Sequence, residues 1–148
     1  MTTPNQRLTF LTLGARDIKT LRAFYKGLGW KVAFEAPDGF VSFRVGGVIL
    51  ALWPLDQLAA EAAPGVEPPS GGWRGVTLGS NVDAKDDVDK MFAAWVDAGA
   101  TPITPPWDTE WGGRSSYVAD PEGNRWEIAW NDAVRFTADG AVAGFADS

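Results

Sequence analysis

The stretch Asp120-Pro121-Glu122-Gly123-Asn124-Arg125-Trp126-Glu127 decides the fold, because it predicts a tight turn that leads directly into a strand. Aspartate, proline and glycine close together are typical of turns, and the alternating residues 125–130 are typical of a strand. Residues 115–119 predict the strand before the turn. Side chains alternate between the two faces of a strand, so we expect Glu127 on one face and Trp126 on the other.

Along the rest of the chain, the same order of predicted strands and helices occurs twice. In the first half, residues 8–13 predict a strand, 18–28 a helix capped by Asp17, and 30–35, 40–45 and 48–53 three more strands. In the second half, 75–82 predict a strand, 83–98 a helix capped by Asp83, and 101–103, 115–119 and 125–130 three more strands. Leu13-Gly14 and Leu78-Gly79 hold the same place in both halves. We interpret the chain as a duplicated βαβββ unit.

The two units fit one domain over residues 1–148. We place module 1 at about residues 8–54, a linker at about 63–72, module 2 at about 73–131 and a tail at 132–148. The linker contains three prolines and three glycines, which is typical of a connecting segment. A short helix is expected at 55–62, before the linker, and a small hairpin around Asp139-Gly140 in the tail.

Composition excludes several classes of function. The chain has 148 residues, a net charge of -6, no cysteine and no histidine. The missing thiols exclude disulfides and thiolate metal sites, and the missing imidazoles remove the commonest metal ligand and general base. The negative charge disfavours nucleic acid and anionic membrane surfaces as partners. No export signal or membrane span is visible, so we expect a cytoplasmic protein.

Three motifs carry a resemblance to a known family. They are Leu11-Thr12-Leu13-Gly14-Ala15-Arg16-Asp17, Ala23-Phe24-Tyr25 and the stretch 120–127. Through them the chain resembles the glyoxalase/bleomycin-resistance/extradiol-dioxygenase superfamily, also called vicinal oxygen chelate proteins, over about residues 8–131. The resemblance implies an α+β fold in which two tandem βαβββ modules form a cup-shaped curved sheet with helices outside. It also implies a homodimer.

Enzymes of that superfamily hold a divalent metal through the first and fourth strands of each module. The corresponding positions here are Phe10, Leu50, Gly75 and Glu127. A single carboxylate does not make a site that needs three or four protein ligands. We therefore expect no metal and no cofactor, and no metal-dependent glyoxalase or dioxygenase activity.

The candidate ligand site combines strand and loop residues. Trp107 and Trp111 lie in a loop expected at the mouth of the cup, where they offer stacking surfaces or pack on a dimer partner or the tail. Arg114 offers a guanidinium to an anion or is simply solvated. Glu127 is a tentative general base and ligand contact, or a buried acid bonded to neighbouring hydroxyls. The full expected site comprises Phe10, Thr12, Leu50, Leu52, Thr77, Trp107, Trp111, Arg114, Tyr117 and Glu127.

Three functions remain open. The first is metal-free binding of a small hydrophobic or aromatic molecule, of the sequestration or resistance type. The second is a lyase, isomerase or dioxygenase-type enzyme that uses Glu127 as general base or as its sole retained metal ligand. The third is a protein that acts through protein contacts, with its cup filled by its own side chains. The sequence does not identify the ligand.

Overall fold

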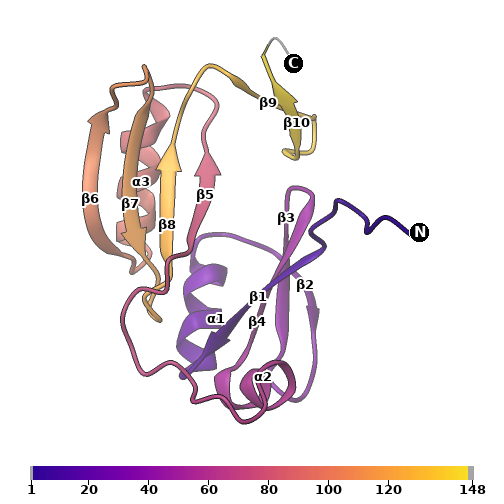
Figure 1. Cartoon of the computed structure of the whole chain (residues 1–148). Coiled ribbons are helices and arrows are strands. Elements are labelled where there is room, and N and C mark those ends of the chain that lie inside the picture. Colours follow the sequence, from indigo (N-terminus) through magenta and orange to yellow (C-terminus); the bar gives the residue numbers. More distant parts are fainter. Residues whose placement is uncertain (1, 147–148) are drawn as a thin grey trace.

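The computed structural model describes residues 2–146, which form two four-stranded sheets and a two-stranded hairpin (Figure 1). Module 1 contains β1 (Phe10–Ala15), α1 (Ile18–Gly27), β2 (Val32–Glu35), β3 (Val41–Val45) and β4 (Val48–Pro54), with strand order β1-β4-β3-β2. Module 2 contains β5 (Thr77–Asn81), α3 (Asp87–Asp97), β6 (Thr101–Asp108), β7 (Arg114–Ala119) and β8 (Arg125–Ala129), with strand order β5-β8-β7-β6. In each sheet the first strand runs parallel to the last. The predicted α+β fold of two βαβββ modules is confirmed.

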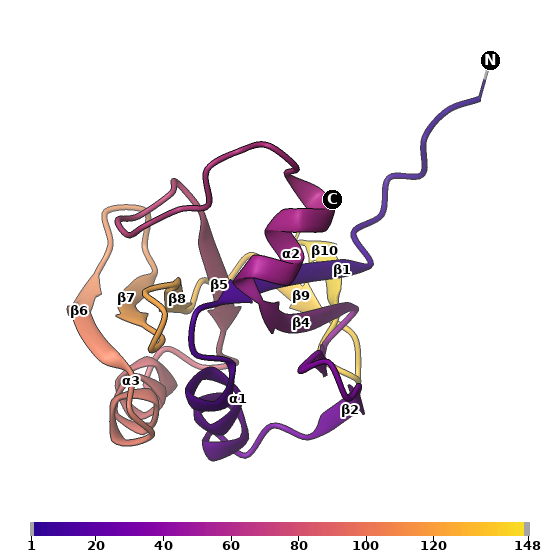
Figure 2. The ribbon, with the colours of Figure 1, turned by 90° about the horizontal axis from the view of Figure 1, so that it is seen from below.

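The elements outside the two modules also match the sequence. The helix α2 (Leu55–Ala62) follows β4 and covers the side of β1 that faces away from α1 (Figure 2). Gly14 permits this close approach, because a Cβ there would lie 2.6 Å from the Leu55 Cδ1 atom. The tail forms the predicted hairpin from β9 (Val134–Phe136) and β10 (Val142–Phe145).

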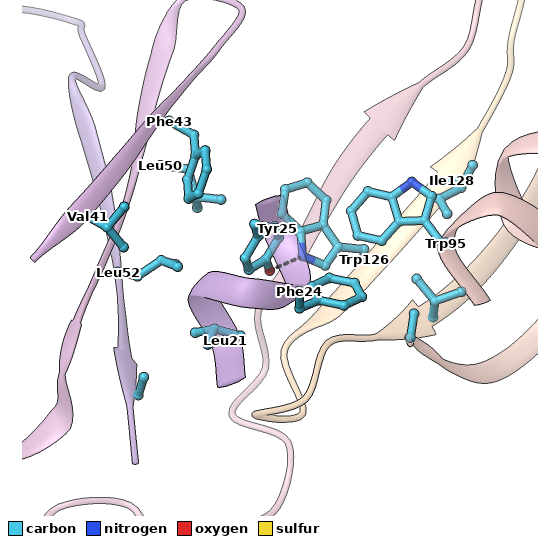
Figure 3. Packing of buried hydrophobic residues seen from close by; sticks show 13 residues of the cluster. Leu21, Phe24, Tyr25, Val41, Phe43, Leu50, Leu52, Trp95, Trp126 and Ile128 are labelled. Carbon is cyan, nitrogen blue, oxygen red and sulfur yellow. Dashed lines mark hydrogen bonds between the residues drawn. The ribbon is translucent and has the colours of Figure 1, made fainter. Parts of the chain in front are cut away.

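Both modules contribute to one hydrophobic core. In Figure 3, Tyr25 and Phe24 of α1 lie between the sheet of module 1 and Trp126 and Trp95 of module 2. The ring centroids of Phe24 and Trp95 are 6.0 Å apart, and those of Trp95 and Trp126 are 5.1 Å apart. Since α1 and α3 cover only one face of each sheet, we call the opposite face the open face.

Two elements differ most from their predicted bounds. The helix α3 starts at Asp87, and its N-cap is Asp86 without a side-chain hydrogen bond, so the expected cap at Asp83 is wrong. The strand β6 continues to Asp108, although residues 101–103 alone were expected. Prolines stop most strands, but β6 is an edge strand that pairs only with β7, and its register shifts absorb them.

The tail returns from module 2 to module 1. The Arg44 guanidinium forms an ion pair with Asp139 at 2.8 Å, so the tail hairpin lies against the β3–β4 turn (Figure 1). A Cβ at Gly46 would lie 3.0 Å from the Gly140 carbonyl oxygen. Thus the tail bridges the two modules at the end opposite the linker.

Candidate functional site

The motifs behind the family resemblance meet where the two modules join. The Tyr25 hydroxyl donates to Asp120 Oδ2 at 2.6 Å, and Trp126 Nε1 donates to the Tyr25 oxygen at 2.9 Å (Figure 3). The Asn124 side chain and the backbone N–H groups of Glu122 and Asn124 also donate to the Asp120 carboxylate. Asp120 is only 2% exposed. Hydrogen bonds within the protein therefore satisfy this carboxylate, which is buried between the two modules.

The same turn also holds the start of α1. The Glu122 carboxylate accepts from the backbone N–H of Arg16 at 3.0 Å and of Asp17 at 2.9 Å. Asp17 in turn caps α1 by accepting from the backbone N–H of Thr20 at 3.1 Å. Burial, followed by the adjacent Asp120 carboxylate, raises the pKa of Tyr25 well above its usual value. These contacts join the two modules.

The open face of module 2 has a different character. Trp107 of β6, Ser115 and Tyr117 of β7 and Glu127 of β8 lie across three neighbouring strands, and we call these four residues the open-face row. The rings of Trp107 and Tyr117 are stacked, with centroids 6.2 Å apart and an interplanar angle of 23°. Trp107 is 39% exposed. The row therefore presents an aromatic surface to solvent.

A carboxylate and two hydroxyls stand at one end of this surface. The Ser115 hydroxyl donates to Glu127 Oε2 at 2.6 Å. Tyr117 lies directly opposite Glu127 in the strand register. Partial burial, together with the neighbouring Glu127 charge, raises the pKa of Tyr117. Tyr117 thus keeps its proton at neutral pH, and the row combines a hydrogen-bond donor with an acceptor for charged or polar donors.

The prediction that Arg114 lies with this site is wrong. Arg114 points to the α3 side of the sheet, where it contacts Asp89 at 2.8 Å and Asp108 at 3.0 Å. Hydrogen bonds to Arg114 lower the pKa of both carboxyl groups. An acidic residue of α3 therefore holds this guanidinium.

Leu50 and Leu52 were expected beside Glu127, and that placement is also wrong. Both side chains are buried in the core on the α1 side. The register explains the error: Leu13 pairs with Leu52 and the equivalent Leu78 pairs with Trp126, so Trp53 is the counterpart of Glu127. Glu127 was expected to correspond to Leu50, three residues before Trp53, and an odd number of residues moves the expected position to the opposite face of the strand.

Of the remaining strand residues, Thr77 shares the sheet of Glu127, whereas Phe10 and Thr12 belong to the other sheet. Phe10 and Thr12 lie on β1, in a sheet that shares no strand pairing with module 2. Thr77 is exposed at the start of β5, opposite Arg125. Gly75 precedes β5 with a φ of 81°, so its expected place on the first strand of module 2 is wrong.

Trp111 is exposed in the loop between β6 and β7. It is 59% exposed, and its ring covers Gly113 so closely that a Cβ there would overlap it. The Arg114–Trp130 bridge, at which β8 pairs with β7, lies next to Gly113. The glycine therefore lets Trp111 fold down against this end of the sheet.

The residues present do not fit the divalent metal that the family resemblance implies. Within residues 2–146, no group of three or more acidic, cysteine or histidine residues has the geometry of a metal site. Phe10 and Trp53 occupy positions where ligands would be needed in module 1, and neither donates to a metal. Glu127 alone supplies a carboxylate, and Ser115 already donates to it. No chemical step here is assigned to a metal.

The comparison with protein families decides the relationship. The model of the glyoxalase/bleomycin resistance protein/dioxygenase superfamily matches residues 7–128. The chain belongs to this superfamily. The comparison with curated proteins finds no match.

Solved structures of superfamily members share this architecture. A glyoxalase-related enzyme from Fulvimarina pelagi is 32% identical, with a TM-score of 0.83 over 94% of this chain and 98% of that one. A glyoxalase/bleomycin resistance protein/dioxygenase from Nocardioides is 27% identical, with a TM-score of 0.70 over 86% of this chain and 85% of that one. A lactoylglutathione lyase from Agrobacterium tumefaciens, at 24% identity and TM-score 0.64 over 85% and 94% of the two chains, shows likeness of fold alone.

Sequence reasoning missed Ser115, which the structure brings to Glu127. Ser115 and Tyr117 are two residues apart on one strand, so their side chains lie on the same face, and that spacing was the available signal. The stacking of Trp107 on Tyr117 had no such signal, because it depends on the register shifts of β6.

In the described part of the chain, no helix is long and apolar enough to span a membrane.

Proposed function

We propose that this superfamily member binds a small hydrophobic or aromatic molecule on the open face of module 2, without a metal. The observation that carries the proposal is the exposed Trp107–Tyr117 stack beside the Glu127 carboxylate. An aromatic ligand laid on this stack gains offset-stacking contacts of about 0.5–1.5 kcal/mol beyond the burial of its surface. Binding of the sequestration or resistance type follows, since nothing in the row requires the ligand to react.

Glu127 gives the site a preference among aromatic molecules. A carboxylate accepts hydrogen bonds from hydroxyls, and more strongly from a charged amine. The Ser115 hydroxyl donates to one oxygen of this carboxylate at 2.6 Å, and the Tyr117 hydroxyl also hydrogen-bonds to Glu127. A carboxylate has about four acceptor sites, so Glu127 can accept a further donor from a ligand. We infer a ligand that carries a planar ring and a hydrogen-bond donor, with the cationic donor favoured.

A second candidate function is proton transfer by the same residues. Tyr117 and Glu127 lie opposite each other, so a base and a donor for a developing oxyanion stand side by side. In such a lyase or isomerase, Glu127 removes a proton from carbon and the Tyr117 hydroxyl donates to the neighbouring oxygen. Glu127→Gln then abolishes turnover while binding of an unreactive ring persists through Trp107.

Calorimetric titration with 2-naphthol and 1-naphthylmethylamine tests the binding proposal. We expect Trp107→Ala to weaken binding of both compounds about tenfold, since one stacking partner is lost. Glu127→Gln is expected to weaken the amine more than the naphthol. Trp111→Ala removes another exposed tryptophan, which lies outside the open-face row, and serves as the control. Binding that is absent in the wild type, or unchanged by Trp107→Ala, contradicts the proposal.

We further propose that the protein is a homodimer. Module 1 exposes Phe10 at 54% and Phe34 at 60%. Both lie on its open face, because Phe10 pairs with Ile49 and Phe34 with Ser42, away from the core positions. Exposed aromatic residues on one face are typical of a surface that a partner covers. Sedimentation equilibrium is expected to give twice the chain mass, and Phe34→Ser to lower the dimer's stability.

A further inference from the structure

The structure contains a second candidate site, away from the open-face row. A cavity of about 150 Å³ lies between the end of β1, the linker and the Asp120–Asn124 turn. Arg16, Arg74 and Arg125 line it: Arg16 follows β1, Arg74 lies in the continuation of the linker before β5, and Arg125 is the first residue of β8. Glu122 and Trp73 also line the cavity. We call this cavity the arginine pocket.

The three guanidinium groups have no acidic partner. Among residues 2–146, none of them forms an ion pair, whereas Arg22, Arg44 and Arg114 do. Arg16 donates to the Pro69 carbonyl at 2.8 Å, Arg125 reaches the Gly123 carbonyl only at 3.5 Å, and Arg74 forms no side-chain hydrogen bond with any described residue. Most donors of these side chains are therefore free to bind a ligand.

Glu122 offsets only one of these three positive charges. Both of its oxygens accept from backbone N–H groups, those of Arg16 and Asp17. This leaves three cations and one committed carboxylate around a single cavity, in a chain whose net charge is -6. Like charges gathered in a concave site repel one another, and a bound anion relieves that repulsion.

We propose that the arginine pocket binds a small oxyanion, either a phosphate or a carboxylate group. Guanidinium groups match both anions, because their planar donor fork forms paired hydrogen bonds with two oxygens. A cavity of about 150 Å³ accommodates such a group. The Trp73 ring lines the cavity and is 59% exposed, so it offers a surface to a ring attached to the anion.

Binding in this pocket has a structural consequence. The ligand contacts module 1 through Arg16, the linker through Arg74 and module 2 through Arg125. It therefore ties the linker to both modules, and it stabilises the folded chain in proportion to its concentration above the dissociation constant. This function is separate from aromatic binding, because none of the four residues of the open-face row lines the pocket.

Titration calorimetry and thermal unfolding with inorganic phosphate, phenyl phosphate and benzoate test the proposal, at constant ionic strength maintained with chloride. We expect saturable binding and a raised Tm for at least one of these anions. A preference for phosphate over benzoate assigns a phosphate ligand, and the reverse preference a carboxylate. Tighter binding of phenyl phosphate than of inorganic phosphate supports the role of Trp73.

Charge-matched variants locate the binding. Arg74→Gln and Arg125→Gln are each expected to weaken binding at least tenfold. Arg7→Gln removes the same charge from an exposed position outside the pocket and is expected to bind like the wild type. The proposal is overturned if no anion binds in the wild type, or if Arg7→Gln weakens binding as much as Arg74→Gln does.

Discussion

Asp120 and Glu127 belong to the same eight-residue motif, yet their surroundings differ completely. Asp120 is 2% exposed and accepts from Tyr25, from the Asn124 side chain and from two backbone N–H groups. Glu127 lies on the open face, where its hydrogen-bond partners are the hydroxyls of Ser115 and Tyr117. The difference shows that the buried start of the motif joins the two modules, whereas its last residue lies on the open face.

The largest expected effect is the loss of the Asp120 carboxylate. Asp120→Ala leaves the Tyr25 hydroxyl and several N–H groups buried without an acceptor, so we expect the free energy of unfolding to fall by about 3 kcal/mol or more. Asp120→Asn keeps one acceptor oxygen and should lose less. Glu127→Ala, on the open face, should cost about 1 kcal/mol. Urea unfolding measures all three, and an equal loss for the two alanine variants would contradict the comparison.

The two tyrosines of the chain distinguish the module junction from the open face through the pH dependence of the folding stability. The pKa of Tyr25 is raised well above 10.0 by burial and by Asp120. The unfolded chain releases this proton near pH 10 while the folded chain keeps it, so stability is full below pH 10 and falls as the pH rises further. The expected slope is about 1.4 kcal/mol for each pH unit. Chemical unfolding at pH 9 to 11 measures it.

Variants of the two tyrosines show which residue causes this dependence of the unfolding free energy on pH. Tyr25→Phe is expected to remove most of it, after correction for its lower stability at neutral pH. Tyr117→Phe is expected to remove less, because the pKa of Tyr117 is raised by a smaller degree of burial and by Glu127. The comparison would be wrong if Tyr117→Phe removed the larger share of the slope.

A smaller effect distinguishes the two faces of β7. Arg114 and Ser115 are adjacent, but Arg114 contacts Asp89 and Asp108 on the α3 side. Arg114→Gln is expected to lower the urea midpoint by less than Asp120→Ala does, with a smaller loss at high salt, because salt screens exposed ion pairs. Binding of 2-naphthol should not change. Weakened naphthol binding would place Arg114 in the ligand site after all.

The smallest expected effect concerns the tail. Arg44→Gln breaks the ion pair with Asp139, whose two side chains are mostly exposed, so global stability should hardly change. Hydrogen exchange of the amides in β9 and β10 should nevertheless speed up, because the hairpin loses its attachment to the β3–β4 turn. Unchanged exchange in that hairpin would show that other contacts hold the tail.

The sequence predicted the fold well because its signals were local. The Asp17 cap, the apolar stripe of α1 and the turns around Gly123 and Gly140 depend on neighbours in the chain, and the structure has all of them. The extent of β6 was not predictable in this way, since the strand accepts its prolines only as the edge of a sheet.

The candidate site was predicted less well, because it depends on register. A shift of one residue moves a side chain to the opposite face, and an error of this kind placed Leu50 and Leu52 on the wrong side of β4. Glu127 and Tyr117 pair across β8 and β7, where the short Asp120–Asn124 turn sets the register. The bond between Tyr25 and Asp120 joins residues far apart in the chain, and no local pattern predicts such a contact.

The most direct test of the account follows the eight tryptophan indole N–H signals by ¹H–¹⁵N NMR during a titration with 2-naphthol. If the open face binds the ring and the junction only joins the modules, the Trp107 signal shifts most. The signals of Trp95 and Trp126, in the core, then stay in place. Large shifts of Trp126 or Trp95 with an unmoved Trp107 signal would contradict the account.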